Sequence, residues 1–183
     1  MQNMFLKIGV EDNSINGEST DLTATNSLGE EGHVDWIEII NYTHGVSQPA
    51  STIVSSAGGR TVERCHHQDF TITKYLDIAT PQINQWCCMG NHIDKLVIEL
   101  FRSDSSTSDS APVLYMYYVL TDAIISSVTV GGEGGDLPVE QVTFNYGAIY
   151  WKYDPQNHEG GENGAPIGGG WDLITNKPPE TEP

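Results

Sequence analysis

The stretch that decides the fold is VEQVTFNYGAIYWKY, residues 139–153. Val142, Phe144 and Tyr146 alternate with polar residues, so they fall on one face of an extended chain. This two-residue period predicts a strand with one buried face and one face toward solvent. After Gly147 bulky residues stand on both sides of the chain, and we expect either a bulge near this glycine or cover on both faces.

Shorter runs of Val, Ile and aromatic residues, separated by Gly, Asn, Asp and Ser, precede this stretch. They predict a mostly antiparallel β domain of about seven strands. The expected strands are residues 4–8, 35–43, 62–75, 95–102, 113–120, 123–130 and 139–153. Polar loops are expected at residues 22–34, 46–60 and 103–110, and a Gly-rich loop at residues 157–170.

One short helix is indicated at residues 81–89. Thr80 can cap it, a proline stands in its first position, and Gly90 suits its exit. Ile83, Trp86 and Cys87 recur at helical spacing and are expected to pack on the sheet. Together these elements predict a mainly β fold, an antiparallel β-barrel or two-sheet domain with one flanking α-helix over residues 1–175. A flexible tail is expected at residues 176–183.

Charge and length exclude several classes of partner. The 183 residues suffice for one domain, and 25 acidic against 8 basic side chains give a net charge of −17, which repels phosphate. We therefore expect no nucleic acid and no membrane insertion, since the longest apolar run is about half of what a spanning helix needs. No conventional signal peptide is visible and the three cysteines are an odd number, which predicts synthesis in the cytoplasm with reduced thiols.

One group of residues has the chemistry of a soft-metal site: Cys65, His66 and His67, with Cys87, Cys88 and His92 elsewhere in the chain. The neighbouring residues 65–67 would alternate faces on a strand, and no CxxC or HExxH spacing fixes a ligand geometry. We therefore predict no metal and no cofactor.

The sequence also lacks a recognisable catalytic arrangement. Ser126 and Ser127 lie in a β run without the GxSxG spacing of a nucleophile elbow, and GGEGGD at residues 131–136 predicts a turn between strands. With 25 carboxylates, some pair always has the separation that glycoside hydrolysis needs, so the presence of such a pair does not indicate that activity. We predict a protein that is not an enzyme and whose open sheet edges are covered by partners. A secreted β-fold hydrolase or binding module stays the alternative.

Read in order, the chain resembles the haemolysin-coregulated protein (Hcp) family, which forms the inner tube of the bacterial type VI secretion system. The resemblance runs from Phe5 to Trp171 and rests on the order and spacing of many short matches. The matching residues are Phe5, Leu6, Lys7 and Ile8; Gly17 to Asp21; His33 and Trp36 to Ile39; Asp69, Phe70, Lys74, Asp77 and Pro81; Ser126 and Ser127; Gly131, Gly132, Pro138, Glu140 and Phe144; and Trp151, Lys152, Tyr153, Pro155 and Gln156.

This resemblance implies a structural role without catalysis. It implies a β-barrel-like subunit, a homohexamer in the form of a ring, and rings that stack into a hollow tube. The implied partners are a contractile sheath, a trimeric spike protein of the VgrG type and small effector proteins carried in the lumen. The tube would leave the cell without a cleavable signal peptide. A phage-type tail-tube subunit shares this architecture and stays a third possibility.

The same resemblance singles out a stacking loop. Residues 46–60 take the position of the extended loop that projects from one ring toward the next. The expected stacking contacts are Pro49, Ala50, Ser51, Thr52, Ile53, Val54, Ser55 and Ser56. The segment 22–34 is longer than the usual link in this family, and the pair Cys87 and Cys88 is not a family feature.

Overall fold

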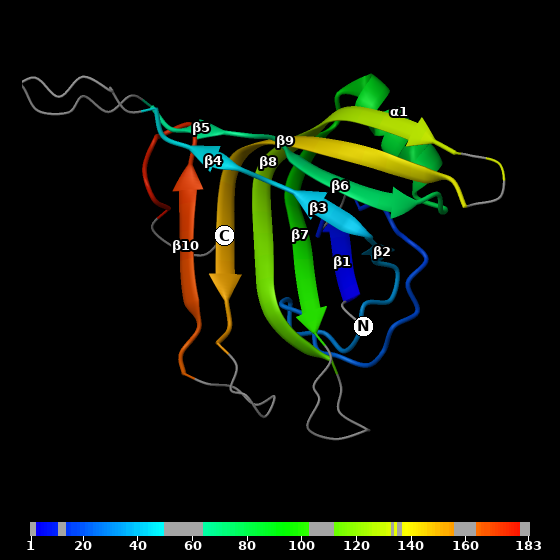
Figure 1. Ribbon diagram of the computed structural model, residues 1–183, viewed down its shortest axis with the longest axis horizontal. Coiled ribbons are helices and arrows are strands. Elements are labelled where there is room, and N and C mark those ends of the chain that lie inside the picture. Colours follow the sequence, from blue (N-terminus) through cyan, green and yellow to red (C-terminus); the bar gives the residue numbers. More distant parts are fainter. Residues whose placement is uncertain are drawn as a thin grey trace, which may run out of the picture.

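The computed structural model describes residues 3–10, 14–49, 64–102, 112–132, 134, 137–155 and 164–179. Within these ranges the fold is mainly β with one helix, which confirms the predicted class (Figure 1). The elements are β1 (Asn3–Ile8), β2 (Ile37–Glu38), β3 (Asn41–Thr43), β4 (Val46–Ser47), β5 (His66–His67), β6 (Phe70–Tyr75), α1 (Thr80–Met89), β7 (His92–Arg102), β8 (Val113–Gly131), β9 (Val139–Tyr153) and β10 (Ile167–Asp172).

Eight of these strands form one antiparallel sheet in the order β2-β1-β7-β8-β9-β6-β3, with β10 paired on β9. The long strand β9 joins the parts of this sheet. β8 pairs along one side of it, while β6 pairs with its first half and β10 with its second half on the other side. The stretch 139–153 therefore holds three strands in register.

The two ends of the sheet are consecutive pieces of one segment. β2 pairs with β1, β3 pairs with β6, and only Ile39 and Ile40 lie between β2 and β3. The Ile39 amide donates to the Met4 carbonyl, and the Ile40 amide donates to the Thr73 carbonyl. The sheet thus curls back on itself as a half-barrel. The single strand predicted at residues 35–43 is wrong, because the segment changes its partner strand between these two isoleucines.

A bend crosses the three central strands. Asp94, Asp122 and Gly147 lie opposite one another in β7, β8 and β9. Asp122 has a φ of 54°, and its side chain lies so close to Gly147 that a Cβ at that position would overlap it. Tyr146 and Ile149 are both buried, so the inward face shifts by one residue at the bend.

The bend corrects two expectations. Residues 113–120 and 123–130 were expected as two strands, yet they form the single strand β8, which is strongly bent (Figure 1). The positive φ of Asp122 lies within this strand. The register between β8 and β9 runs unchanged through Gly147, so the bend, and not an inserted residue in β9, re-aims the strand.

Both faces of the sheet are covered near β1 and β7. One cluster of buried side chains fills the concave side and includes Leu6, Ile98 and Phe144. A second cluster, which includes Phe5 and Phe101, lies on the other face of the same strands. Residues 17–36, which we call the cover segment, close this second cluster with Trp36, which is 2% exposed. The predicted loop at residues 22–34 is therefore part of a packed layer.

The helix agrees with the sequence except at its cap. Ile83 and Trp86 are buried, Cys87 is half-buried against the sheet, and Gly90 ends the helix with a φ of 65°. Ala79 stands at the N-cap, and none of the described side chains forms a capping hydrogen bond there. Thr80 is thus not the cap: its hydroxyl accepts from the Asp77 amide and donates to Glu140.

The remaining differences lie at element ends. β7 begins three residues before the predicted position, and the predicted strand 62–75 is divided into β5 and β6. β4 arises inside a segment expected as a loop, and β10 begins inside another and ends two residues beyond it. In the described part of the predicted tail, Lys177 exchanges two backbone hydrogen bonds with Asp172. No helix of the described residues is long and apolar enough to cross a membrane.

Candidate functional site

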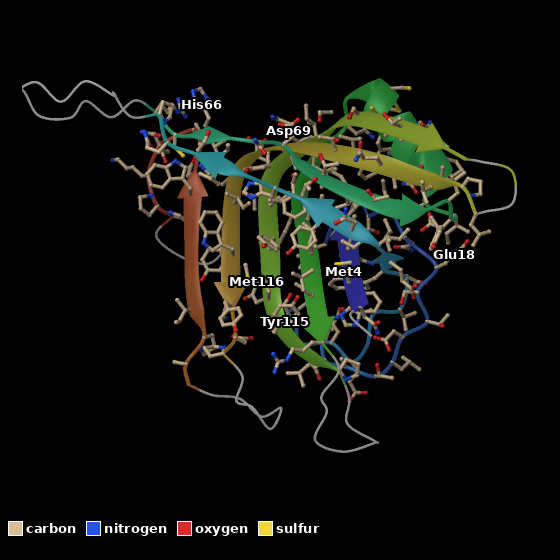
Figure 2. The ribbon with its side chains drawn as sticks, viewed as in Figure 1. Met4, Glu18, His66, Asp69, Tyr115 and Met116 are labelled. Carbon is tan, nitrogen blue, oxygen red and sulfur yellow. The ribbon has the colours of Figure 1, made fainter. Side chains whose placement is uncertain are left out.

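A two-stranded ribbon carries the predicted stacking loop. β4 and β5 pair through Val46 with His67 and Ser47 with His66, and the Gln68 amide donates to the Gly45 carbonyl at 2.9 Å. Figure 2 shows His66 at one end of the molecule. Of the predicted stacking residues, Pro49 follows the ribbon, whereas Ala50, Ser51, Thr52, Ile53, Val54, Ser55 and Ser56 lie outside the described residues.

Two histidines attach this ribbon to the sheet. His44 Nε2 lies 2.7 Å and His67 Nδ1 lies 3.3 Å from the hydroxyl of Tyr146 on β9. The His44 ring also stacks on Phe70. Burial lowers the pKa of both histidines, and the charge of His67 lowers the pKa of His44 further. Burial raises the pKa of Tyr146, so all three groups are neutral at neutral pH and serve as a polar anchor.

The residues that were considered as a soft-metal group do not come together. The Cys65 thiol donates to the Ser47 carbonyl at 3.3 Å, and His66 points away from His67 on the ribbon. Cys87 and Cys88 lie on α1, and His92 pairs with carboxylates at the bend. Within the part of the chain that the structure describes, no three His, Cys, Asp or Glu side chains are arranged to hold a metal.

An aromatic pocket of 380 Å³ lies beside the ribbon. Trp151 and Trp171 form its aromatic wall, and Arg64 contributes a charge at its margin. The remaining lining residues are Val46, Gln48, Cys65, His67, Gly170 and Asn176. The pocket is thus bounded by four strands, β4, β5, β9 and β10, and no sequence pattern connected them.

The serines considered as nucleophiles have no histidine beside them among the described residues. The Ser126 hydroxyl donates to Asp69 at 2.9 Å, and the side-chain amide of Asn145 donates to the other oxygen of the same carboxylate at 2.8 Å. This surface group joins the strands β8 and β9 to the residue before β6. Among the described residues it therefore lacks the histidine of a Ser-His-Asp triad.

A buried polar group that the sequence reasoning missed lies under the cover segment. His33 is fully buried, with Nδ1 3.2 Å from Asp21 and Nε2 2.9 Å from Glu99. Glu99 also accepts from the amide and hydroxyl of Ser27, at 2.8 and 2.5 Å. Burial alone would raise the pKa of Asp21, but hydrogen bonds from Thr23 and His33 outweigh burial and hold it below its ordinary value.

A second buried group joins the helix to the sheet. Lys74 is fully buried and pairs with Asp77 at 2.6 Å and with Glu140 at 2.8 Å. The Thr80 hydroxyl, at the start of α1, donates to the same Glu140 oxygen. These three charged residues are also among the positions that carry the family resemblance, but their spacing along the chain gives no sign that they meet.

Neither buried group has the arrangement of an active site. His33 lies between the rings of Phe5, Trp36 and Phe101, so no substrate reaches it in this conformation. Lys74 is also fully buried. Both groups hold irregular segments against the sheet.

Both the sequence and the fold of this chain are similar to those of known proteins. Residues 5–153 match the family described as "Type VI secretion system effector, Hcp". The chain is 30% identical to Protein hcp1 of Pseudomonas aeruginosa over 174 residues, which cover 94% of this chain and 96% of that protein. A solved structure described as that of a type six secretion system protein superposes with a TM-score of 0.79 at 25% identity, covering 98% of this chain and 100% of the other. Hcp1 from Salmonella typhimurium has the same fold, with a TM-score of 0.68 at 21% identity and coverage of 97% and 98%.

Proposed function

The chain belongs to the Hcp family and is a structural subunit of the type VI secretion tube, and we propose that six copies close into a ring and that rings stack into this tube. The single observation that carries the assignment is the family match over residues 5–153 together with a fold that superposes over nearly the whole chain. A ring needs contacts that repeat head to tail between identical subunits, which requires two different surfaces on each copy.

The stacking contacts are proposed for Pro49 to Ser56. The ribbon of β4 and β5 supports this proposal, because it lies at one end of the molecule and the anchor of His44, His67 and Tyr146 fixes its base. A loop on a fixed stem can present its side chains to a neighbouring ring without disturbing the sheet.

The finer partners are part of the same proposal. We propose that the tube is driven by a contractile sheath, ends in a trimeric VgrG-type spike and carries effector proteins in its lumen. The family is secreted through the type VI system. We propose that this chain is made in the cytoplasm and leaves without a cleavable signal peptide.

We also propose that the chain has no catalytic role of its own. The polar groups that the fold brings together support this. Among the residues that the structure describes, Ser126 has a carboxylate but no histidine beside it, and His33 is closed off from solvent. No specific observation favours the alternative of a hydrolase or binding module.

The mass of the purified protein under native conditions tests the ring. Six copies of a 20.0 kDa chain give a particle of 120 kDa, and negative-stain images should show annular particles. A lone 20.0 kDa particle at high concentration and moderate salt would contradict the ring.

A further inference from the structure

Two exposed apolar surfaces lie at opposite ends of the molecule. Figure 2, which has the longest axis horizontal, places Glu18 near one end and His66 near the other. The first surface is the turn between β6 and α1, and the second is the aromatic pocket beside β4 and β5. A head-to-tail contact between identical copies requires two different surfaces on each copy.

The first surface, which we call the apolar turn, consists of Tyr75, Leu76 and Ile78. These side chains are 51%, 40% and 61% exposed. The turn is nevertheless held in place, since the Ile78 amide donates to Glu18 at 3.0 Å and the Leu76 amide donates to the Pro138 carbonyl at 3.3 Å. Large apolar side chains on a fixed turn are a preformed contact that loses little conformational freedom on binding.

The second surface has space for such side chains. The aromatic pocket measures 380 Å³, whereas truncation of one buried leucine to alanine opens a cavity of about 150 Å³. Its aromatic wall of Trp151 and Trp171 is only half-buried within one copy. The pocket can therefore take one or two aliphatic side chains.

The charges of the two surfaces are opposite. Arg64 is the basic residue that lines the aromatic pocket. Glu18 and Glu38 line a cleft with the apolar turn at the other end. In a chain with a net charge of −17 most surfaces repel their copies, so a basic margin facing an acidic one selects this pairing over others.

We propose that the ring closes through one contact, in which the apolar turn of each copy enters the aromatic pocket of the next. This inference rests on the proposed ring and names the surfaces that form it. The occupant of the pocket is a second copy of this chain, with Ile78 and Leu76 against the two tryptophans and Glu18 or Glu38 near Arg64.

Two single substitutions test each surface separately. Ile78→Asp places a charge on the apolar turn, and Val46→Asp places one at the rim of the pocket. Both side chains are exposed, at 61% and 48%, so each variant should keep the fold, which circular dichroism checks. The matched control is Leu22→Asp, which changes an exposed apolar residue, at 71%, on the cover segment. We expect both test variants to run as 20.0 kDa monomers and the control to form rings like the unchanged chain.

Mixing the two variants gives the sharper result. The Ile78→Asp variant keeps an intact pocket, and the Val46→Asp variant keeps an intact apolar turn. The mixture should therefore form a dimer with one copy of each variant and no larger particle. Rings of either variant alone, or two monomeric variants that do not pair when mixed, would overturn the contact. An unchanged chain that stays monomeric would instead overturn the proposed ring itself.

Discussion

At the scale of single residues, His33 is held between two carboxylates without contact with solvent. Asp21 and Glu99 each accept further hydrogen bonds, from Thr23 and Ser27, so both act as acceptors. The two ring nitrogens of His33 lie 3.2 and 2.9 Å from these carboxylates. The network therefore ties Asp21, at one end of the cover segment, to β7 at Glu99. Its cost of desolvation is offset only while all three partners are present.

Removal of the imidazole should therefore be strongly destabilising. His33→Ala leaves Glu99 buried without its partner, and breaking a buried pair typically costs about 3–5 kcal/mol of the free energy of unfolding. Urea unfolding measures the change. The matched control is His92→Ala, which removes a histidine paired at the surface with Asp122 and Asp94 and should cost less than about 1 kcal/mol. Equal losses in the two variants would show that the buried network contributes nothing special.

At the scale of elements, sequence periodicity predicted the regular strands and the helix. It failed where an element is defined by a contact and not by its own residues. The polar residue Asp122 interrupts the apolar pattern and therefore predicts the end of a strand. The space left by Gly147 nevertheless lets β8 bend at Asp122 and continue. β10 contains Gly168, Gly169 and Gly170, a sequence that predicts a loop, and it becomes a strand by pairing with β9.

Candidate functional residues were harder to predict than strands. The pattern at residues 65–67 and the serines at 126–127 drew attention through residue type alone, and the fold separates them from suitable partners. The groups that do meet, Lys74 with Glu140 and His33 with Glu99, are 66 residues apart in each pair. In a chain with 25 acidic residues, sequence alone does not show which carboxylate lies beside which base.

The glycines of β10 should differ in their tolerance to a side chain. A Cβ on Gly170 would lie 2.8 Å from Pro179 Cγ and 2.9 Å from the Ile149 carbonyl oxygen, whereas a Cβ on Gly169 comes no nearer than 3.4 Å to Trp151. Gly170→Ala should therefore cost about 1–3 kcal/mol by overpacking. Gly169→Ala is the matched control and should be close to neutral in urea unfolding. A Gly170 variant as stable as this control would mean that β10 shifts freely on β9.

The ribbon anchor should make stability depend on pH. Burial, aided at His44 by the charge of His67, lowers the pKa of both histidines in the folded chain. The unfolded chain then binds more protons near the ordinary histidine pKa of about 6.5, so their contribution is complete above that pH and declines as the pH falls through it.

The urea midpoint at about pH 7.5 and about pH 5.5 measures this dependence. The double variant His44→Asn with His67→Asn should lose less stability on acidification than the unchanged chain. His66→Asn, an exposed change on the same ribbon, should keep the full dependence. If the double variant lost as much as the unchanged chain, the anchor would not be the source of the pH effect.

At the scale of the whole molecule, charge opposes the assembly that the fold supports. Six copies at −17 each carry −102 in a ring. Within a ring, buried apolar side chains can offset this repulsion at about 25 cal/mol per Å² of apolar surface, and their contact is little affected by salt. Between rings, the two facing surfaces carry the same sign of charge and repel each other across their whole area. Ring formation and ring stacking should therefore respond differently to ionic strength.

Stacking should strengthen as salt is added while the ring stays unchanged. The screening length falls from about 30 Å at 0.01 M salt to about 3 Å at 1 M, so the repulsion between facing rings is removed over this range. Light scattering should rise with ionic strength as rings join into tubes, and the native mass of the smallest particle should remain that of six copies. Scattering that is flat across the same range would mean that charge does not control stacking. A ring that dissociates at low salt would mean instead that its own contact is too weak to resist the charge of six copies.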